Sequence, residues 1–207
     1  MSKKIITIGR QFGSGGHEIG ERLSKQLHLP LYDRNLVQMA AEKAGIDTKE
    51  AISIDEKTLF NFMMSYQTPW TMDTPYFMPE YGETESDRLF LAQAAVIKSL
   101  AASGPCIIIG RCADFVLKGY PGLINVFICA SNEDRIKRLM DVRGYSRKDA
   151  ESKMKKNDRS RKTYYETYTG QEWGSIHSHQ MLLNVSLLGA DNIVEIIKNM
   201  YESDIKF

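Results

Sequence analysis

The stretch of sequence that decides the fold is Ile5-Ile6-Thr7-Ile8-Gly9-Arg10-Gln11-Phe12-Gly13-Ser14-Gly15-Gly16-His17-Glu18-Ile19-Gly20. It opens with a run of β-branched residues, which predicts a buried strand over 5–8. Four glycines follow within residues 9–16 and predict a loop. Ile19, Leu23 and Leu27 then recur at every fourth position, which predicts the apolar face of a helix. The order strand, glycine-rich loop, helix is the strongest local signal in the chain.

A loop in this position is suited to binding phosphate. Glycines allow backbone N–H groups to approach phosphate oxygens, and the following helix adds the positive end of its dipole. In the P-loop pattern G-x-x-x-x-G-K-[ST], Arg10 takes the first position and Gly15 that of the second glycine. Gly16 and His17 then stand where the lysine and the magnesium-binding hydroxyl belong. The skeleton of a P-loop is therefore present without two of its functional side chains.

Another cation must replace the lysine, which normally contacts the β- and γ-phosphates. Arg10 is the closest candidate within the loop, His17 is a weaker one, and Ser14 is the only hydroxyl in the loop that could approach a metal ion. A dinucleotide-binding pattern, G-x-G-x-x-G, also remains open. It begins at Gly13 and meets Glu18 at its last glycine, with Asp33 at the distance of its acid.

The remaining pattern predicts alternating strands and helices. We expect further strands over 106–110, 126–130 and 182–185, and helices over 35–44, 88–102, 133–143, 146–165 and 192–201. Such alternation is typical of an α/β fold with a doubly wound parallel sheet.

Composition excludes several classes of protein. The 27 Lys and Arg nearly balance 26 Asp and Glu, so bulk charge gives no case for nucleic acid as a partner. Three cysteines without CxxC spacing argue against a disulfide framework and a zinc site. No apolar run is long enough for a membrane span or a signal peptide, so we expect a cytoplasmic protein. The basic segment 131–165 is either a solvated helix face or a surface for a polyanionic ligand.

Residues 46–87 form the segment that is hardest to interpret. They contain methionines, aromatic residues and three prolines, and they predict either a functional lid or an interface loop. Methionine and aromatic side chains are enriched in protein interfaces, so a homodimer is a candidate assembly.

Several motifs follow one another along almost the whole chain. They are Ile6-Thr7-Ile8-Gly9-Arg10 with the loop to Gly20, Leu31-Tyr32-Asp33, Ile107-Ile108-Ile109-Gly110-Arg111, Val126-Phe127-Ile128 with Glu133-Asp134-Arg135-Ile136, Asp158-Arg159-Ser160-Arg161, and Asn184-Val185-Ser186-Leu187-Leu188. In this order they resemble the cytidylate kinase-like branch of the P-loop nucleoside-monophosphate kinases.

The resemblance implies a P-loop kinase fold in a single domain. The core would be about 1–45 and 88–207, with an acceptor-side insertion over about 46–87 and a lid over about 144–175. It implies an enzyme that uses ATP and Mg²⁺ to phosphorylate a small phosphate-bearing acceptor, with CMP or dCMP as candidates. The alternative is a nucleotide-binding sensor that does not catalyse, because the P-loop lysine is absent.

The candidate site residues fall into three groups. Donor phosphates are assigned to Gly13, Ser14, Gly15, Gly16 and His17; the acceptor to Asp33, Arg111 and Asp114; and catalysis to Arg10, Arg159 and Arg161. Phosphoryl transfer depends on positioning and positive charge, and guanidinium groups bind phosphate in a bidentate way. Asp33 has a second interpretation as the cap of the helix over 35–44. The metal ligands stay open, because Asp33 could help to bind either the acceptor or a metal ion.

Overall fold

The computed structural model describes residues 4–33, 35–45 and 85–203. The predicted insertion over 46–87 therefore lies almost entirely outside the described residues. The chain forms two compact units, one of Met1–Asp33 with Ile97–Phe207 and one of Arg34–Val96. All motifs of the predicted phosphate site lie in the first unit.

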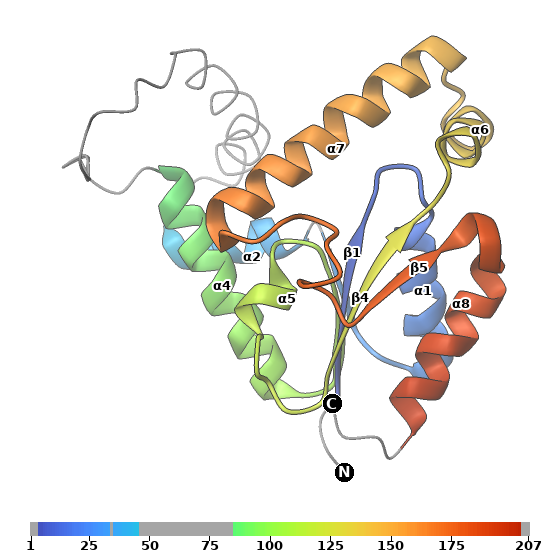
Figure 1. Cartoon of the computed structure of the whole chain (residues 1–207). Coiled ribbons are helices and arrows are strands. Elements are labelled where there is room, and N and C mark those ends of the chain that lie inside the picture. Colours follow the sequence, from blue (N-terminus) through green and yellow to red (C-terminus); the bar gives the residue numbers. More distant parts are fainter. Residues whose placement is uncertain (1–3, 34, 46–84, 204–207) are drawn as a thin grey trace. The chain divides into compact units, whose positions relative to one another are not determined.

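A five-stranded sheet forms the centre of the first unit (Figure 1). Its strands are β1 (Ile5–Arg10), β2 (Leu31–Tyr32), β3 (Cys106–Ile109), β4 (Leu123–Cys129) and β5 (Met181–Asn184). The order is β2-β3-β1-β4-β5, and every pair is parallel. The predicted α/β fold with a doubly wound parallel sheet is confirmed.

Helices cover the sheet on its two sides. Helices α1 (Gly16–Leu27) and α8 (Val185–Glu202) pack on one face, where Ile6 and Ile8 of β1 are fully buried. The short helix α5 (Ala113–Val116) lies on the other side (Figure 1). The connections after β1 and β3 thus leave toward opposite faces, and open α/β sheets bind ligands at such a switch point, beyond the carboxyl ends of the strands.

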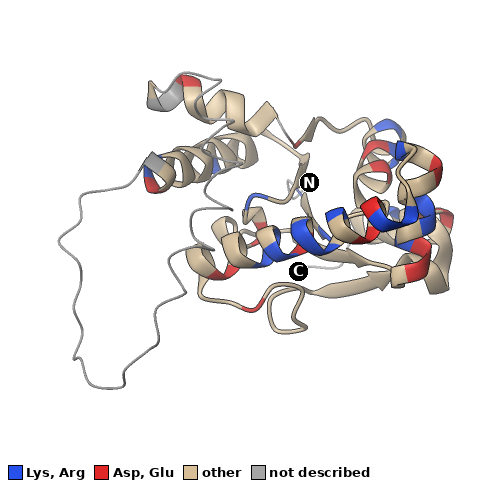
Figure 2. Ribbon diagram, turned by 90° about the horizontal axis from the view of Figure 1, so that it is seen from above, with Lys and Arg blue, Asp and Glu red and all other residues tan. Residues whose placement is uncertain are grey.

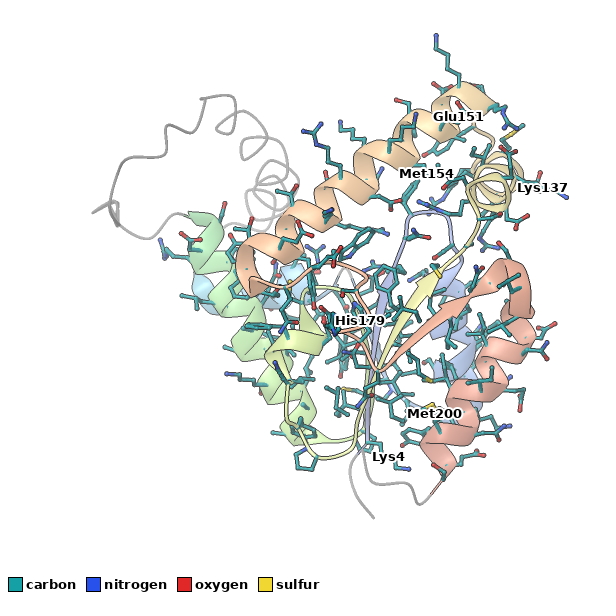
Figure 3. All side chains as sticks on the ribbon, in the orientation of Figure 1. Lys4, Lys137, Glu151, Met154, His179 and Met200 are labelled. Atoms are coloured by element: carbon teal, nitrogen blue, oxygen red, sulfur yellow. The ribbon has the colours of Figure 1, made fainter. Side chains whose placement is uncertain are left out.

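Helices α6 (Asn132–Arg143) and α7 (Arg147–Thr169) follow β4, and both carry basic and acidic residues (Figure 2). Each begins at a serine whose hydroxyl accepts a backbone N–H: Ser131 from Asp134, and Ser146 from Asp149. The two helices share a small apolar cluster of Ile136, Leu139, Ala150 and Met154, with Phe12 of the glycine loop packed against it. Figures 1 and 3 show α7 extending past the loop that follows β1, with Met154 facing α6.

The end of the first unit differs in detail from prediction. Helix α8 begins directly after β5, whereas the periodicity predicts a helix only from 192. The two differ because Gly189 (φ 75°, ψ 153°) interrupts the first turns of the helix. At its other end, Lys4 Nζ donates to the carbonyl oxygens of Met200 and Tyr201 at 3.3 and 2.8 Å (Figure 3). A cation at a helix C-terminus is favourable toward the dipole.

The second unit contains α2 (Asn35–Ala44) and most of α4 (Glu85–Ser103). Helix α2 has the bounds that the sequence predicts, and α4 begins three residues earlier than predicted. Helix α2 buries Leu36, Val37, Ala40 and Ala41.

Candidate functional site

The glycine-rich loop occupies residues 11–15, between β1 and α1, at the carboxyl edge of the sheet. Gln11 anchors it to the end of β4: its backbone N–H donates to Ile128 O (3.0 Å), and its side-chain oxygen accepts from Ala130 N (3.1 Å). The Ser14 hydroxyl donates to Gln11 O at 2.9 Å and is buried. Gly15 precedes the helix in the left-handed region (φ 86°). Hydrogen bonds thus fix the shape of the loop, and the start of a helix is in general a favourable place for an anion.

The residue at the lysine position of the motif is glycine for a steric reason. A Cβ on Gly16 would lie 2.7 Å from Arg10 Cβ and 3.2 Å from Arg10 Cγ. The aliphatic part of Arg10 therefore occupies the space that a side chain at position 16 would need. Its guanidinium continues toward the turn after β3, where a Cβ on Gly110 would collide with Arg10 Nη1. One arginine thus spans from the start of the loop to the end of β3.

Asp33, directly after β2, orients two of the predicted site residues. Its Oδ1 accepts from Arg10 Nη2 at 3.2 Å, and its Oδ2 lies 3.1 Å from His17 Nδ1. The Asp33 carboxylate is partly buried, whereas His17 is exposed, with Nε2 3.5 Å from Glu21 Oε1. Asp33 therefore links β2 to both ends of the loop.

The turn after β3 has an unusual backbone. Gly110, Arg111 and Cys112 are all left-handed, with φ of 71°, 58° and 54°. Hydrogen bonds from Gly110 N to Ile8 O (3.0 Å) and from Ala113 N to Gly110 O (3.1 Å) hold the turn in place. A left-handed conformation costs a non-glycine residue about 1–2 kcal/mol, and such strain is concentrated at functional sites.

Arg161 of α7 reaches the same place from the other side of the loop. Its Nη1 donates to Arg10 O at 3.0 Å, and its Cζ lies 5.6 Å from the centroid of the Phe12 ring. Burial and the positive charges of Arg10 and Arg111 together lower the pKa of Arg161 to about 9, although Asp158 and Asp33 act in the opposite direction. The positive charges of Arg10, Arg111 and Arg161 therefore act on one another, while Asp158 is also paired with Arg135. The surplus positive charge favours an anion.

Two predicted residues lie apart from this cluster. Arg159 is exposed on α7 and stands about 200° around the helix from Arg161, two residues away. Asp114 accepts a 2.6 Å hydrogen bond from the Tyr165 hydroxyl, and burial raises the pKa of its carboxyl. Within the described residues, no hydrogen bond or ion pair joins either of them to Arg10, Asp33 or Arg161.

Sequence reasoning missed three contributors. Tyr165, which the pattern interprets as a packing residue, holds Asp114. Asp158 and Arg135 form hydrogen bonds with the backbone of Phe12. A signal existed for Asp158, because its spacing of three from Arg161 places both on one face of a helix. Nothing in the sequence indicates the burial of Arg135.

A buried histidine lies beside the central strands β1 and β4 (Figure 3). His179 Nδ1 is 3.0 Å from Asn125 Oδ1, and the centroid of its ring lies 5.0 Å from that of Phe127, with the two rings tilted by 39°. Burial lowers the pKa of His179 to about 4. This side chain is therefore neutral at physiological pH and contributes packing rather than charge.

The described part of the chain contains no group of three or more His, Cys, Asp or Glu side chains arranged to hold a metal ion. Within the same residues, no helix is long and apolar enough to cross a membrane.

A glycine-rich loop between the first strand and the first helix, at the carboxyl edge of an all-parallel sheet with helices on both sides, is the arrangement of P-loop kinase folds. The sequence model of the cytidylate kinase-like family matches residues 5–187, and the chain belongs to this family. Family and fold together indicate a kinase of nucleotides or other small molecules. A search of curated proteins found no match.

Solved structures agree on the fold. The chain is similar to an uncharacterized protein from Eubacterium ventriosum, with 24% identity and a TM-score of 0.72 over 97% of this chain and 99% of that one. It is also similar to a gluconokinase from Sinorhizobium meliloti (16% identity, TM-score 0.52, 96% and 91% covered). A shikimate kinase from Acinetobacter baumannii, solved with shikimate, has 13% identity and a TM-score of 0.50, with 97% and 93% covered.

Proposed function

We propose that this protein transfers the γ-phosphoryl group of ATP to an oxygen of a small phosphate-bearing acceptor, with CMP and dCMP as the first candidates. The observation that carries the proposal is the contact of Arg161 Nη1 with Arg10 O, at 3.0 Å, beside the loop; burial and the positive charges of Arg10 and Arg111 lower the pKa of Arg161 there. An anion of several charges would relieve that repulsion. In the transition state of transfer, the γ-phosphoryl group and the phosphates beside it form such an anion.

The donor would lie on the loop and the first turn of α1. Glycines at 13, 15 and 16 let the backbone approach phosphate oxygens, and the helix start supplies N–H donors. ATP enters with its Mg²⁺ as part of the substrate, and Mg²⁺ in such sites is held mainly by phosphates, waters and one or two carboxylates. Asp33 is the carboxylate beside the loop that could serve, although it also holds Arg10 and His17. The Ser14 hydroxyl, already bonded to Gln11, is a poorer ligand.

Arg10 would take the part of the missing lysine. Its guanidinium lies between the donor loop and the Gly110–Cys112 turn, which is where the transferring group must pass. Asp33 keeps this guanidinium in place, so little reorganisation is needed when charge develops.

Arg111 would hold the acceptor's own phosphate at the end of β3. Asp33 would face the acceptor from the end of β2, and Asp114 would act indirectly, by fixing the turn that carries Arg111 through its bond to Tyr165. The phosphoryl group would move from the β-phosphate bridging oxygen of ATP to the acceptor oxygen, and ADP would leave. Arg161 would neutralise the charge on the group in transit.

The second candidate function is a nucleotide sensor without catalysis. Gly16 at the lysine position favours it, because known P-loop chemistry relies on that lysine. This function predicts saturable ATP binding with no product from any acceptor.

The deciding experiment measures ADP formation from Mg-ATP over a panel of CMP, dCMP, UMP, AMP, GMP and nucleosides. The test variants are Arg111→Ala and Arg161→Ala, and the control is Arg143→Ala, an exposed arginine at the end of α6. Acceptor-dependent ADP that falls in both test variants and persists in the control supports the kinase. ATP binding without ADP, for every acceptor, supports the sensor.

A further inference from the structure

The backbone of Phe12 is held by two charged side chains from different helices. Phe12 N donates to Asp158 Oδ1 of α7 at 2.7 Å, and Arg135 Nε of α6 donates to Phe12 O at 2.8 Å. Arg135 Nη2 is in turn paired with Asp158 Oδ2. The contacts close a ring that passes from the loop to α7, to α6 and back to the loop.

The two charged side chains of this ring are mostly shielded from solvent, and their opposite charges are paired. The Arg135 side chain is 3% exposed and that of Asp158 19%. Hydrogen bonds with an ionised partner are shorter and stronger than neutral ones. The Phe12 ring adds apolar contact with the α6–α7 cluster, while Arg161 lies over its face. Neither charge could stay in this place without the other.

Phe12 stands at the point of the loop where its conformation matters most. It lies two residues after Arg10 and directly before Gly13, the first glycine of the phosphate cradle. Fixing both backbone groups of Phe12 fixes the direction in which the chain enters that cradle. Donors that are already oriented stabilise developing charge without reorganising at the moment of reaction.

We infer that Asp158 and Arg135 are positioning residues that set the shape of the phosphate loop before any nucleotide binds. Helix α7 is then a fixed part of the donor site, joined to the loop at Phe12 N and at Arg10 O. The catalytic consequence of this inference rests on the proposed function, whereas its structural consequence does not.

The first test measures amide hydrogen exchange in the nucleotide-free protein, residue by residue, by NMR. Asp158→Ala alone would leave Arg135 buried and unpaired, so the main variant is the double change Arg135→Met/Asp158→Ala, which removes both charges and keeps most of the volume. The control is Asp141→Asn, at an exposed carboxylate on α6.

We expect exchange at the Phe12 amide to accelerate by about tenfold or more in the double variant. Amides of β1 and β4 should keep their wild-type protection, and Asp141→Asn should change neither. In Arg135→Met/Asp158→Asn, which retains an acceptor oxygen for Phe12 N–H and leaves no unpaired charge, much of the protection should return. Wild-type exchange at Phe12 in the double variant would overturn the inference, and so would acceleration that is equal in the loop and in the strands.

The second test measures ATP affinity by calorimetry and steady-state kinetics on the same variants. We expect the Kd for ATP to rise about tenfold in the double variant, while the KM of an acceptor stays within a factor of two. An unchanged Kd for ATP would overturn the inference. If no acceptor is phosphorylated by the wild type, the proposed function fails, but the exchange and ATP-binding results still decide the role of Asp158 and Arg135.

Discussion

Arg10 occupies the space beside Gly16 and would act in place of the P-loop lysine, so substitutions at the two positions should depend on each other. Restoring the usual lysine by Gly16→Lys alone should harm the protein, because its Cβ would lie 2.7 Å from Arg10 Cβ. Arg10→Gly alone should remove the cation and leave Asp33 without its 3.2 Å partner. The double variant Arg10→Gly/Gly16→Lys recreates the full G-x-x-x-x-G-K pattern and frees the space for the new side chain.

The magnitudes follow from packing and charge. Forcing extra atoms into a filled space costs about 1–3 kcal/mol of unfolding free energy. Removing one member of a partly buried hydrogen-bonded ion pair costs a similar amount, about 1–3 kcal/mol. In the double variant the steric cost disappears, so the two losses should not add. We expect a coupling free energy of about 1–2 kcal/mol, within the range found for residues in contact.

Chemical denaturation of the wild type, both single variants and the double variant measures this coupling directly. The same four proteins are then assayed for ADP formation, where each single change should lower kcat by about 10²–10³-fold, the usual effect of losing one charge-stabilising donor. The double variant should recover at least part of that loss. A Gly16→Lys protein as stable and active as the wild type would refute the reasoning, and so would a double variant whose losses equal the sum of the single ones.

The remaining predictions concern α7 and the buried groups beside it. Arg161→Ala should lower kcat by about 10²-fold or more, while Arg159→Ala, on the exposed side of the helix, should leave it within a factor of two; equal losses would contradict the geometry. Tyr165→Phe should cost about 1–3 kcal/mol in denaturant unfolding, because the partly buried Asp114 loses its hydroxyl donor; a neutral effect would contradict this role of the hydroxyl. Burial lowers the pKa of His179 from 6.5 to about 4 in the folded protein. As the pH falls, this histidine is therefore protonated first in the unfolded chain. The free energy of unfolding should fall by about 3 kcal/mol between pH 6.5 and pH 4. His179→Asn should remove that part of the acid dependence in unfolding measured across this window, and an unchanged pH slope would contradict the assignment.

The amino-acid sequence by itself determined the fold class and the place of the glycine-rich loop. The β-branched run at 5–8, the glycines after it and the apolar spacing of Ile19, Leu23 and Leu27 are local signals, and β1, the loop and α1 follow them closely. Such patterns work because strand and helix periods differ, and because glycine allows turns that other residues resist. The alternation of strands and helices likewise predicted a parallel sheet, which the structure contains.

Only the tertiary structure decided which charged residues act together. The resemblance assigns both Arg159 and Arg161 to the site, but the direction of α7 against the loop brings Arg161 to Arg10 O and leaves Arg159 exposed. Arg135 and Asp158 are 23 residues apart in the chain, and each meets Phe12 more than a hundred positions away.

Gly16 shows most clearly the difference between what the sequence determines and what the tertiary structure decides. In the sequence, position 16 lacks the lysine of the P-loop pattern. In the structure, Arg10 occupies the space that a side chain at this position would need, because of how β1 and α1 pack. Steric exclusion and charge pairing over such distances depend on atomic positions in the folded chain, and no local periodicity carries that information.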